Sequence, residues 1–176
     1  ELMGGSIETS SELGEGSTFV ISIPFDPASA PRETEQAASG STLQGRRLLL
    51  VEDNDLNAEI AATILEGDGA YVSIAGDGAQ AVEAFAATPA GTFDAILMDV
   101  AMPKMDGLAA TRAIRALDRP DAASIPIIAM TGNAFQEDVR ECLEAGMNAH
   151  IAKPIDAAKA ERVIAKAMGR RENSVQ

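Results

Sequence analysis

The chain of 176 residues has little of several residue types that define particular protein classes. It has one cysteine, so no disulfide can form within it, and Cys142 has no second thiol or nearby histidine with which to share a metal. No apolar run approaches the roughly 20 residues that a membrane-spanning helix needs. We therefore expect a reducing, cytoplasmic setting and no direct membrane contact.

Basic residues are also scarce. Lysine and arginine number 14 against 27 aspartate and glutamate residues, which gives a formal net charge of −13. A field of this sign repels the phosphate backbone of nucleic acids and anionic lipid. The composition thus predicts no nucleic-acid partner, while 46% hydrophobic residues exclude a wholly disordered chain.

Four segments differ in composition. Residues 1–26 hold a glycine-rich turn at Gly14 and Gly16 followed by an alternating strand pattern, and they are too few to bury a core of their own. Residues 27–45 are rich in Pro, Ala, Ser, Thr, Glu and Gln, with Leu43 as the one large apolar residue, which is typical of a linker. We expect residues 46–169 to form a domain and residues 170–176 to form a polar tail. The chain has no initiator methionine and no signal peptide, so we expect a piece of a longer protein.

The domain alternates short apolar runs with amphipathic stretches of helical length, which predicts an α/β fold with a parallel sheet covered on both faces. Five runs indicate five strands, and the stretches between them indicate helices. Leu56, Ile60 and Ile64 repeat at every fourth residue and predict the buried face of the first helix. In the same way, the fourth helix is expected to bury Phe135, Val139, Cys142 and Leu143, and the last helix Ala160, Val163, Ile164 and Ala167.

Polar residues stand where these strands end. Glu52 and Asp53 follow the first strand, Asp99 ends the third, Thr131 ends the fourth, and Lys153 follows the fifth. Because the carboxyl ends of parallel strands share one edge of a sheet, we expect these side chains to converge there.

Three close carboxylates repel each other by about 4 kcal/mol per pair at an effective dielectric constant near 20, so the cluster favours a divalent cation. Oxygen ligands on an open rim indicate Mg²⁺, which completes its shell with waters and phosphate oxygens. We therefore predict phosphoryl transfer, with Asp99 as nucleophile, Glu52 and Asp53 holding the metal, and Thr131 and Lys153 meeting the other phosphoryl oxygens.

Four motifs resemble a response-regulator receiver domain from about Arg46 to Met168: Val51-Glu52-Asp53-Asn54, Met98-Asp99 through Met102-Pro103 to Asp106-Gly107, Met130-Thr131-Gly132-Asn133-Ala134, and Lys153-Pro154-Ile155. The resemblance implies a flavodoxin-like (βα)5 fold with strand order 2-1-3-4-5. It also implies that Asp99 accepts phosphate from a phosphohistidine, that the backbone carbonyl of Ala101 is a metal ligand, and that Lys153-Pro154 is cis.

The same resemblance implies that Thr131 and Lys153 couple phosphorylation to a change of the surface near the fourth and fifth strands. His150 stands where family members often carry an aromatic switch residue, so the usual rotamer switch is in doubt. Ala101 and Asn133 occupy positions that influence the lifetime of the phosphate. His150 itself is expected to be a buried packing or switch residue.

Residues 1–26 resemble the end of a histidine-kinase ATP-binding domain, in Met3-Gly4-Gly5-Ser6-Ile7 and Leu13-Gly14-Glu15-Gly16 leading to Ile23-Pro24-Phe25. Together with a receiver domain, this predicts the C-terminal part of a bacterial hybrid sensor histidine kinase. The phosphorylatable histidine and the ATP-binding motifs are absent from the sequence. We therefore expect self-phosphorylation and autodephosphorylation only, and no ATP hydrolysis.

The sequence also allows two other interpretations. Asp53 to Asn57 could begin a calcium loop, but Ala58 and Ile64 replace the glycine and glutamate that such a loop requires, and capping of the first helix by Asn54 or Asp55 explains the segment better. Alternatively, the domain never turns over phosphate and regulates the kinase core by docking through its first or fourth helix.

Overall fold

A computed structural model describes residues 6–12, 14, 16–22, 24, 42–132 and 136–172. The chain divides into two compact units, residues 1–39 and 40–176.

The first unit holds an antiparallel hairpin of β1 (Ser6–Glu12) and β2 (Gly16–Ser22), as the glycine-rich turn predicts. Gly14 and Gly16 have φ angles of 88° and 106°, which side chains larger than glycine rarely adopt. Every residue of both strands is exposed. Ile7 lies opposite Ile21, and Phe19 lies two residues along the same face, so one face of the hairpin is apolar.

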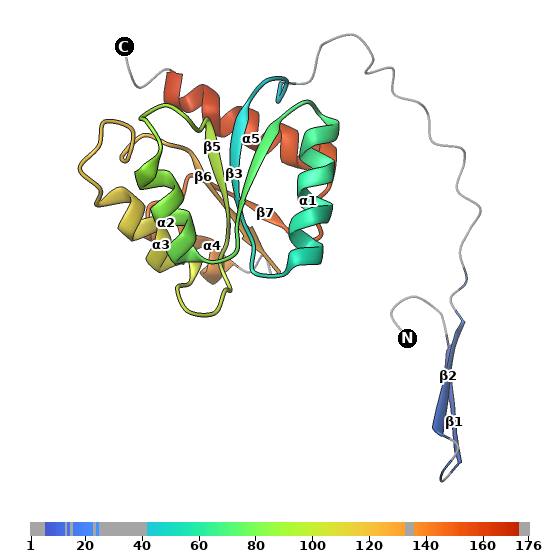
Figure 1. Ribbon diagram of the computed structural model, residues 1–176. Coiled ribbons are helices and arrows are strands. Elements are labelled where there is room, and N and C mark those ends of the chain that lie inside the picture. Colours follow the sequence, from blue (N-terminus) through green and yellow to red (C-terminus); the bar gives the residue numbers. More distant parts are fainter. Residues whose placement is uncertain are drawn as a thin grey trace. The chain divides into compact units, whose positions relative to one another are not determined.

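The second unit combines a parallel sheet with surrounding helices (Figure 1). Its five strands lie in the order β4-β3-β5-β6-β7. Counted among these five strands, this is the expected order 2-1-3-4-5. The strands are β3 (Arg47–Val51), β4 (Tyr71–Ala75), β5 (Ala95–Asp99), β6 (Ile127–Thr131) and β7 (Ala149–Ala152). The helices are α1 (Asp55–Gly67), α2 (Gly78–Ala87), α3 (Gly107–Arg115), α4 (Gln136–Glu144) and α5 (Ala157–Glu172).

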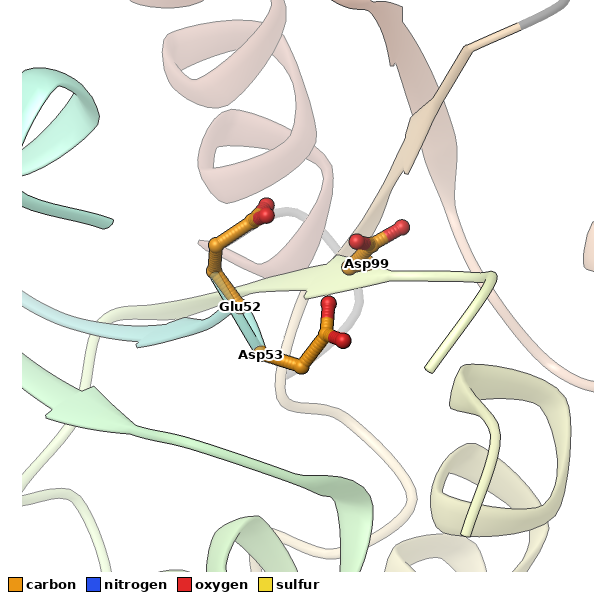
Figure 2. A group of neighbouring side chains, drawn as sticks. All are labelled: Glu52, Asp53 and Asp99. Carbon is orange, nitrogen blue, oxygen red and sulfur yellow. The ribbon is translucent and has the colours of Figure 1, made fainter. Parts of the chain in front are cut away.

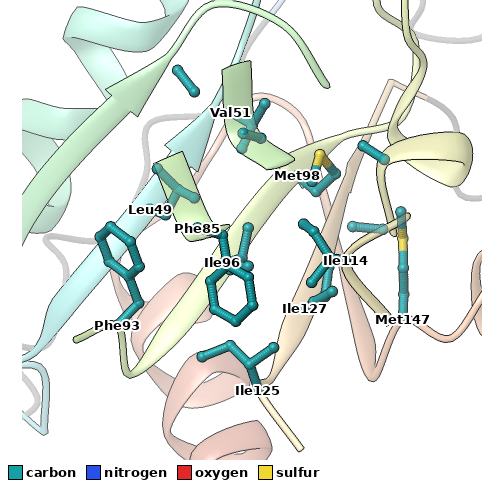
Figure 3. Packing of buried hydrophobic residues seen from close by; sticks show 14 of the residues in the cluster. Leu49, Val51, Phe85, Phe93, Ile96, Met98, Ile114, Ile125, Ile127 and Met147 are labelled. Carbon is teal, nitrogen blue, oxygen red and sulfur yellow. The ribbon is translucent and has the colours of Figure 1, made fainter. Parts of the chain in front are cut away.

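Helices cover both faces of this sheet, which is why its central strands are almost continuously apolar. Successive residues of β3 point to opposite faces: Leu49 and Val51 join one hydrophobic cluster, and Leu48 and Leu50 the other. The first cluster includes residues of α2, α3 and α4, with Phe85 at its centre (Figure 3). The second includes residues of α1 and α5. All residues of β5 and β6 are buried, including the polar residues Asp99 and Thr131 at their carboxyl ends.

The prediction that α1 buries Leu56, Ile60 and Ile64 is wrong. Leu56 and Ile60 are 65% and 52% exposed, and Ile64 is half-buried. The helix instead buries the row of Ala58, Ala61, Ala62 and Leu65. Three alanines let the helix axis lie close to the sheet, and the larger side chains are left on the outer surface.

The fourth and fifth helices differ in outcome. In α4, Cys142 is buried as expected and Val139 is half-buried, but Leu143 is 53% exposed, because adjacent residues of a helix point about 100° apart. Phe135 lies outside the described residues. In α5, Ala160, Ile164 and Ala167 are buried as expected, and Val163 is half-buried against the second cluster.

The expected linker ends too late. Leu43 is fully buried in the second cluster, and the backbone N–H of Thr42 donates to Oε1 of Glu161 on α5 at 2.7 Å. Gly45 N–H donates to the carbonyl of Gly69 at 2.8 Å. Residues 42–45 are therefore part of the domain rather than of the linker predicted over residues 27–45.

Candidate phosphoryl-transfer site

The sheet brings the predicted site residues to one edge. Strand register pairs Val51 with Met98, and Thr131 with Ala152, so neighbouring strands end nearly level. Asp99 is the last residue of β5, and Glu52 and Asp53 continue directly from β3 beside it (Figure 2). The convergence expected of these carboxylates is confirmed.

The three carboxylates form a compact acidic group. One oxygen each of Glu52, Asp53 and Asp99 lies within 4.8 Å of the others. Glu52 and Asp99 are 4% and 5% exposed, whereas Asp53 is open to solvent. Such a group of hard oxygen donors with one open side fits a Mg²⁺ ion that keeps several waters.

Lys153 partly neutralises this group. Its Nζ donates to Oε2 of Glu52 at 2.5 Å and to Oδ2 of Asp99 at 2.6 Å. Burial favours the neutral amine, but the hydrogen bonds to Asp99 and Glu52 outweigh it and raise the pKa of Lys153. Burial also raises the pKa of Asp99, against the lowering effect of Lys153. The Lys153-Pro154 peptide bond is cis, as the family resemblance implies.

Thr131 and Ala101 complete the surroundings of Asp99. The Thr131 hydroxyl is buried and has no hydrogen-bond partner among the residues the structure describes. An orphaned buried hydroxyl is costly unless a ligand satisfies it. The Ala101 N–H donates to Oδ1 of Asp99 at 3.1 Å. A cleft of about 310 Å³ opens here, lined by Asp99, Val100, Ala101, Leu108, Met130, Thr131, Gly132 and Glu141.

Local sequence explains how these groups are held. Asn54 caps α1 by accepting from the Asn57 N–H at 3.0 Å, which confirms the capping interpretation and fixes the turn after Asp53. Gly107 begins α3 so close to β5 that a Cβ would lie 2.2 Å from the Asp99 carbonyl oxygen. Only glycine permits this approach, which closes the loop after the strand.

One contributor was not anticipated. The side-chain amide of Asn57 donates to Oε1 of Glu52 at 3.0 Å, so both oxygens of this carboxylate are engaged. Asn57 stands one turn after the capping Asn54, and that position on α1 is the signal that would have found it. A second cleft of about 380 Å³ adjoins this point, lined by Glu52, Asn57, Ile60, Ala61, Lys153, Pro154 and Ile155.

The two residues expected to tune switching or lifetime lie differently. His150 is half-buried rather than buried, and pairs with Ala129 in the sheet, so it belongs to the face covered by α4. Asn133 lies outside the described residues. The roles of both stay predictions.

Comparison with known proteins agrees with this geometry. The model of the response regulator receiver domain matches residues 48–165, so the chain belongs to this family. Hybrid signal transduction histidine kinase I of Dictyostelium discoideum is 38% identical over 120 residues, 67% of this chain and 7% of the relative. Autoinducer 2 sensor kinase/phosphatase LuxQ of Vibrio vulnificus is 38% identical over 158 residues, 88% of this chain and 18% of the relative.

Solved structures show the same fold. The receiver domain of sensor histidine kinase PA1611 from Pseudomonas aeruginosa PAO1 has a TM-score of 0.64 and 42% identity, covers 71% of this chain and 98% of its own, and holds a magnesium ion coordinated in its active-site cleft. The chain spans less than a fifth of the length of either of these two curated relatives. The relatives come from an amoeba and a plant as well as from a bacterium, so the bacterial origin stays a prediction.

None of the helices described is long and apolar enough to cross a membrane.

Proposed function

We propose that the domain is the phosphoacceptor module of a two-component phosphorelay, in which a phosphoryl group passes from a phosphohistidine to Asp99. The observation that carries this proposal is the setting of the Asp99 carboxylate. It ends a buried strand, one oxygen meets the Lys153 ammonium, and the cleft beside it contains the unsatisfied Thr131 hydroxyl.

In the transfer, a carboxylate oxygen of Asp99 attacks phosphorus and the phosphorus–nitrogen bond of the donor breaks. The imidazole leaves and takes up a proton from solvent, and an acyl phosphate remains on Asp99. Lys153 and Thr131 donate hydrogen bonds to phosphoryl oxygens, where negative charge is concentrated. Glu52, Asp53, Asp99 and the Ala101 carbonyl would hold Mg²⁺, which supplies further neutralisation of that charge when bound.

Intact mass after incubation with acetyl phosphate tests this proposal. We expect a gain of one phosphoryl group that requires Mg²⁺ and is lost in Asp99→Asn. Asp118→Asn, which changes an exposed carboxylate outside the site, is the matched control and should be labelled normally. Persistent labelling of Asp99→Asn at the wild-type level would refute the assignment.

The exposed face of α1 supports a docking surface for the donor on this helix. The α1 stripe, which comprises Leu56, Ile60 and Ile64, is exposed or half-buried beside the 380 Å³ cleft that reaches Glu52 and Lys153. The helix has no basic residue and carries Asp55, Glu59 and Glu66. A phosphohistidine domain that presents apolar side chains ringed by lysine and arginine fits this surface.

Substitutions at two positions of nearly equal exposure distinguish donor docking on the first helix from docking on the fourth. Ile60→Asp on α1 should lower phosphotransfer from a histidine-phosphorylated kinase domain at least tenfold while acetyl phosphate still labels Asp99. Leu143→Asp on α4, where the side chain is 53% exposed against 52% for Ile60, should leave both reactions unchanged. The reverse pattern would place donor docking on α4.

The alternative is a docking module that regulates the kinase core without phosphorylation. The exposed stripe favours it too, since docking alone requires only a surface. It predicts that partner affinity is the same in wild type and Asp99→Asn and does not respond to Mg²⁺, whereas the phosphoacceptor proposal predicts no label at all in that variant.

We further infer that the domain belongs to a cytoplasmic part of a hybrid histidine kinase and that residues 1–26 are the end of its ATP-binding domain. The apolar face of the hairpin, with Ile7, Ile21 and Phe19, supports this because it needs the rest of a larger sheet to cover it. The purified chain should hydrolyse no ATP above background, and measurable turnover would contradict this origin.

A further inference from the structure

The loop that carries the expected backbone ligand is held by a second element of the fold. This ligand loop, residues 100–106, leaves β5 after Asp99 and ends at the start of α3. We propose that Asp77 and Lys104 are a pair of positioning residues that fix the ligand loop, and with it the Ala101 carbonyl, for Mg²⁺ binding. The inference rests on the proposed metal site.

Asp77 is a buried acid that the phosphotransfer chemistry does not use. It is 3% exposed and caps α2, where its Oδ1 accepts from the Gln80 N–H at 2.9 Å. Its other oxygen accepts from Nζ of Lys104 at 2.8 Å and from the Gln80 side chain at 3.3 Å. The hydrogen bond from Lys104 is the main cause that lowers the pKa of Asp77. A cap alone would need no lysine, so the pair does more than begin the helix.

Lys104 holds an unusual backbone conformation at the tip of the ligand loop. Its φ is 67°, and among the described residues no other non-glycine residue has a positive φ. The Met105 N–H donates to the Pro103 carbonyl at 2.9 Å, which closes a γ-turn around Lys104. A lysine at a positive φ is strained relative to glycine, and the ammonium that this lysine contributes is the group that reaches Asp77.

A backbone contact repeats the same connection. The Gly78 N–H donates to the Met105 carbonyl at 3.3 Å, and a Cβ on Gly78 would lie 2.6 Å from that oxygen. At its base the ligand loop is closed by the Gly107 N–H, which donates to the Val100 carbonyl at 3.1 Å. Ala101 therefore lies between a fixed base and a tip that α2 holds.

Fixing the ligand loop lowers the entropy cost of placing a backbone carbonyl on the metal, so loosening its tip should weaken Mg²⁺ binding without removing any ligand. An exposed ion pair contributes modestly, and Lys104 has a side chain that is 73% exposed. We expect each single substitution to weaken Mg²⁺ binding about three- to fivefold.

Isothermal titration with Mg²⁺ and thermal unfolding without Mg²⁺ test this inference on the full chain. Asp77→Asn keeps a capping oxygen and removes the charge, whereas Lys104→Asn tolerates the positive φ and removes the ammonium. Lys104→Arg keeps a positive charge at this position and should bind Mg²⁺ as wild type does. The double variant should bind no more weakly than the weaker single variant, because both substitutions remove one interaction. Arg140→Gln, which breaks the exposed pair with Glu144 on α4, is the control.

The inference is overturned if both single variants bind Mg²⁺ within a factor of two of wild type, or if their effects multiply in the double variant. A loss of thermal stability with unchanged Mg²⁺ affinity would show that the pair only caps α2. Failure of the wild-type chain to bind Mg²⁺ would instead contradict the proposed metal site, and so the two failures are distinguishable.

Discussion

Removing the Lys153 ammonium should destabilise the metal-free domain and make it more responsive to Mg²⁺. In Lys153→Met, Glu52 and Asp99 lose the cation that contacts both, and each is at most 5% exposed. Breaking a buried ion pair by deleting one partner typically costs about 3–5 kcal/mol. Since 24% of the Lys153 side chain is exposed, solvent screens the pair, and we expect a loss of about 2–3 kcal/mol at pH 7.5.

Magnesium should reverse much of this loss. Lys153 and the metal compete for the same carboxylate oxygens, so the variant should bind Mg²⁺ more tightly than wild type. A ligand at 100 times its dissociation constant stabilises the folded state by about 2.7 kcal/mol. The variant's free energy of unfolding should thus rise more on addition of Mg²⁺ than that of wild type.

Lower pH should restore stability by a second route. Burial already raises the pKa of Asp99, and removal of Lys153 raises it further. The folded state then binds a proton more tightly than the unfolded chain, so the deficit is present at pH 7.5 and shrinks as pH falls through the pKa of folded Asp99.

Urea unfolding at pH 7.5 and 5.5, with and without Mg²⁺, measures all three effects. Lys166→Met, at an exposed position on α5, is the control and should change stability by less than about 0.5 kcal/mol. An equal or smaller Mg²⁺ response in Lys153→Met would refute the competition between lysine and metal. A deficit that grows toward pH 5.5 would refute the assignment of its cause to uncompensated carboxylates.

Three further predictions concern stability. Leu43→Ala should lower the free energy of unfolding in urea by about 2–4 kcal/mol, because Leu43 is fully buried. A loss below 1 kcal/mol would indicate that Leu43 belongs to the linker. Gly107→Ala should cost about 2 kcal/mol or more, since its Cβ would lie 2.2 Å from a carbonyl oxygen of β5, whereas Gly132→Ala, with nothing within 4 Å, should be nearly neutral by the same assay. The hydrogen bond from Arg119 lowers the pKa of Asp121 below 3.8, so this pair stabilises the fold above that pH and loses its effect in stronger acid. Asp121→Asn should therefore be less stable than wild type at pH 7, and the difference in the free energy of unfolding should shrink by pH 2.5. A difference that stays constant with pH would contradict this assignment.

The sheet and the site could be predicted because strand ends are marked in the sequence. An apolar run followed by Glu52-Asp53 or ending in Asp99 identifies both a strand and the edge where it stops. Parallel pairing then brings those edges together without any knowledge of side-chain packing. The order of the strands came from the family resemblance, and the structure confirms it.

The face of α1 could not be predicted in the same way. Two rows at helical spacing compete, and the one with larger side chains, which includes Leu56 and Ile60, is more hydrophobic than the row of Ala58 and Ala61. Burial follows the fit against the sheet rather than side-chain size, and fit is a tertiary property. Leu43 was hidden for a related reason, because a single leucine among linker-like residues has no period.

Contacts between distant residues were also beyond the sequence. Lys153 and Glu52 are 101 positions apart, and only the folded sheet shows that one ammonium contacts both Glu52 and Asp99. The pairing of Asp77 with Lys104 depends on a γ-turn that no local sequence pattern predicts.

The position of Lys153 along the chain has a consequence for the order of folding. The carboxylates come from β3 and β5, while the ammonium follows β7, the strand that completes the sheet. A partly folded sheet that lacks β7 therefore concentrates three negative charges with no fixed positive charge beside them. The charge of the site is therefore balanced only once β7 has paired with β6, a pairing that also adds the apolar surface of β7 to the sheet. The residues that prepare the domain for phosphate thus also couple completion of the sheet to completion of the site.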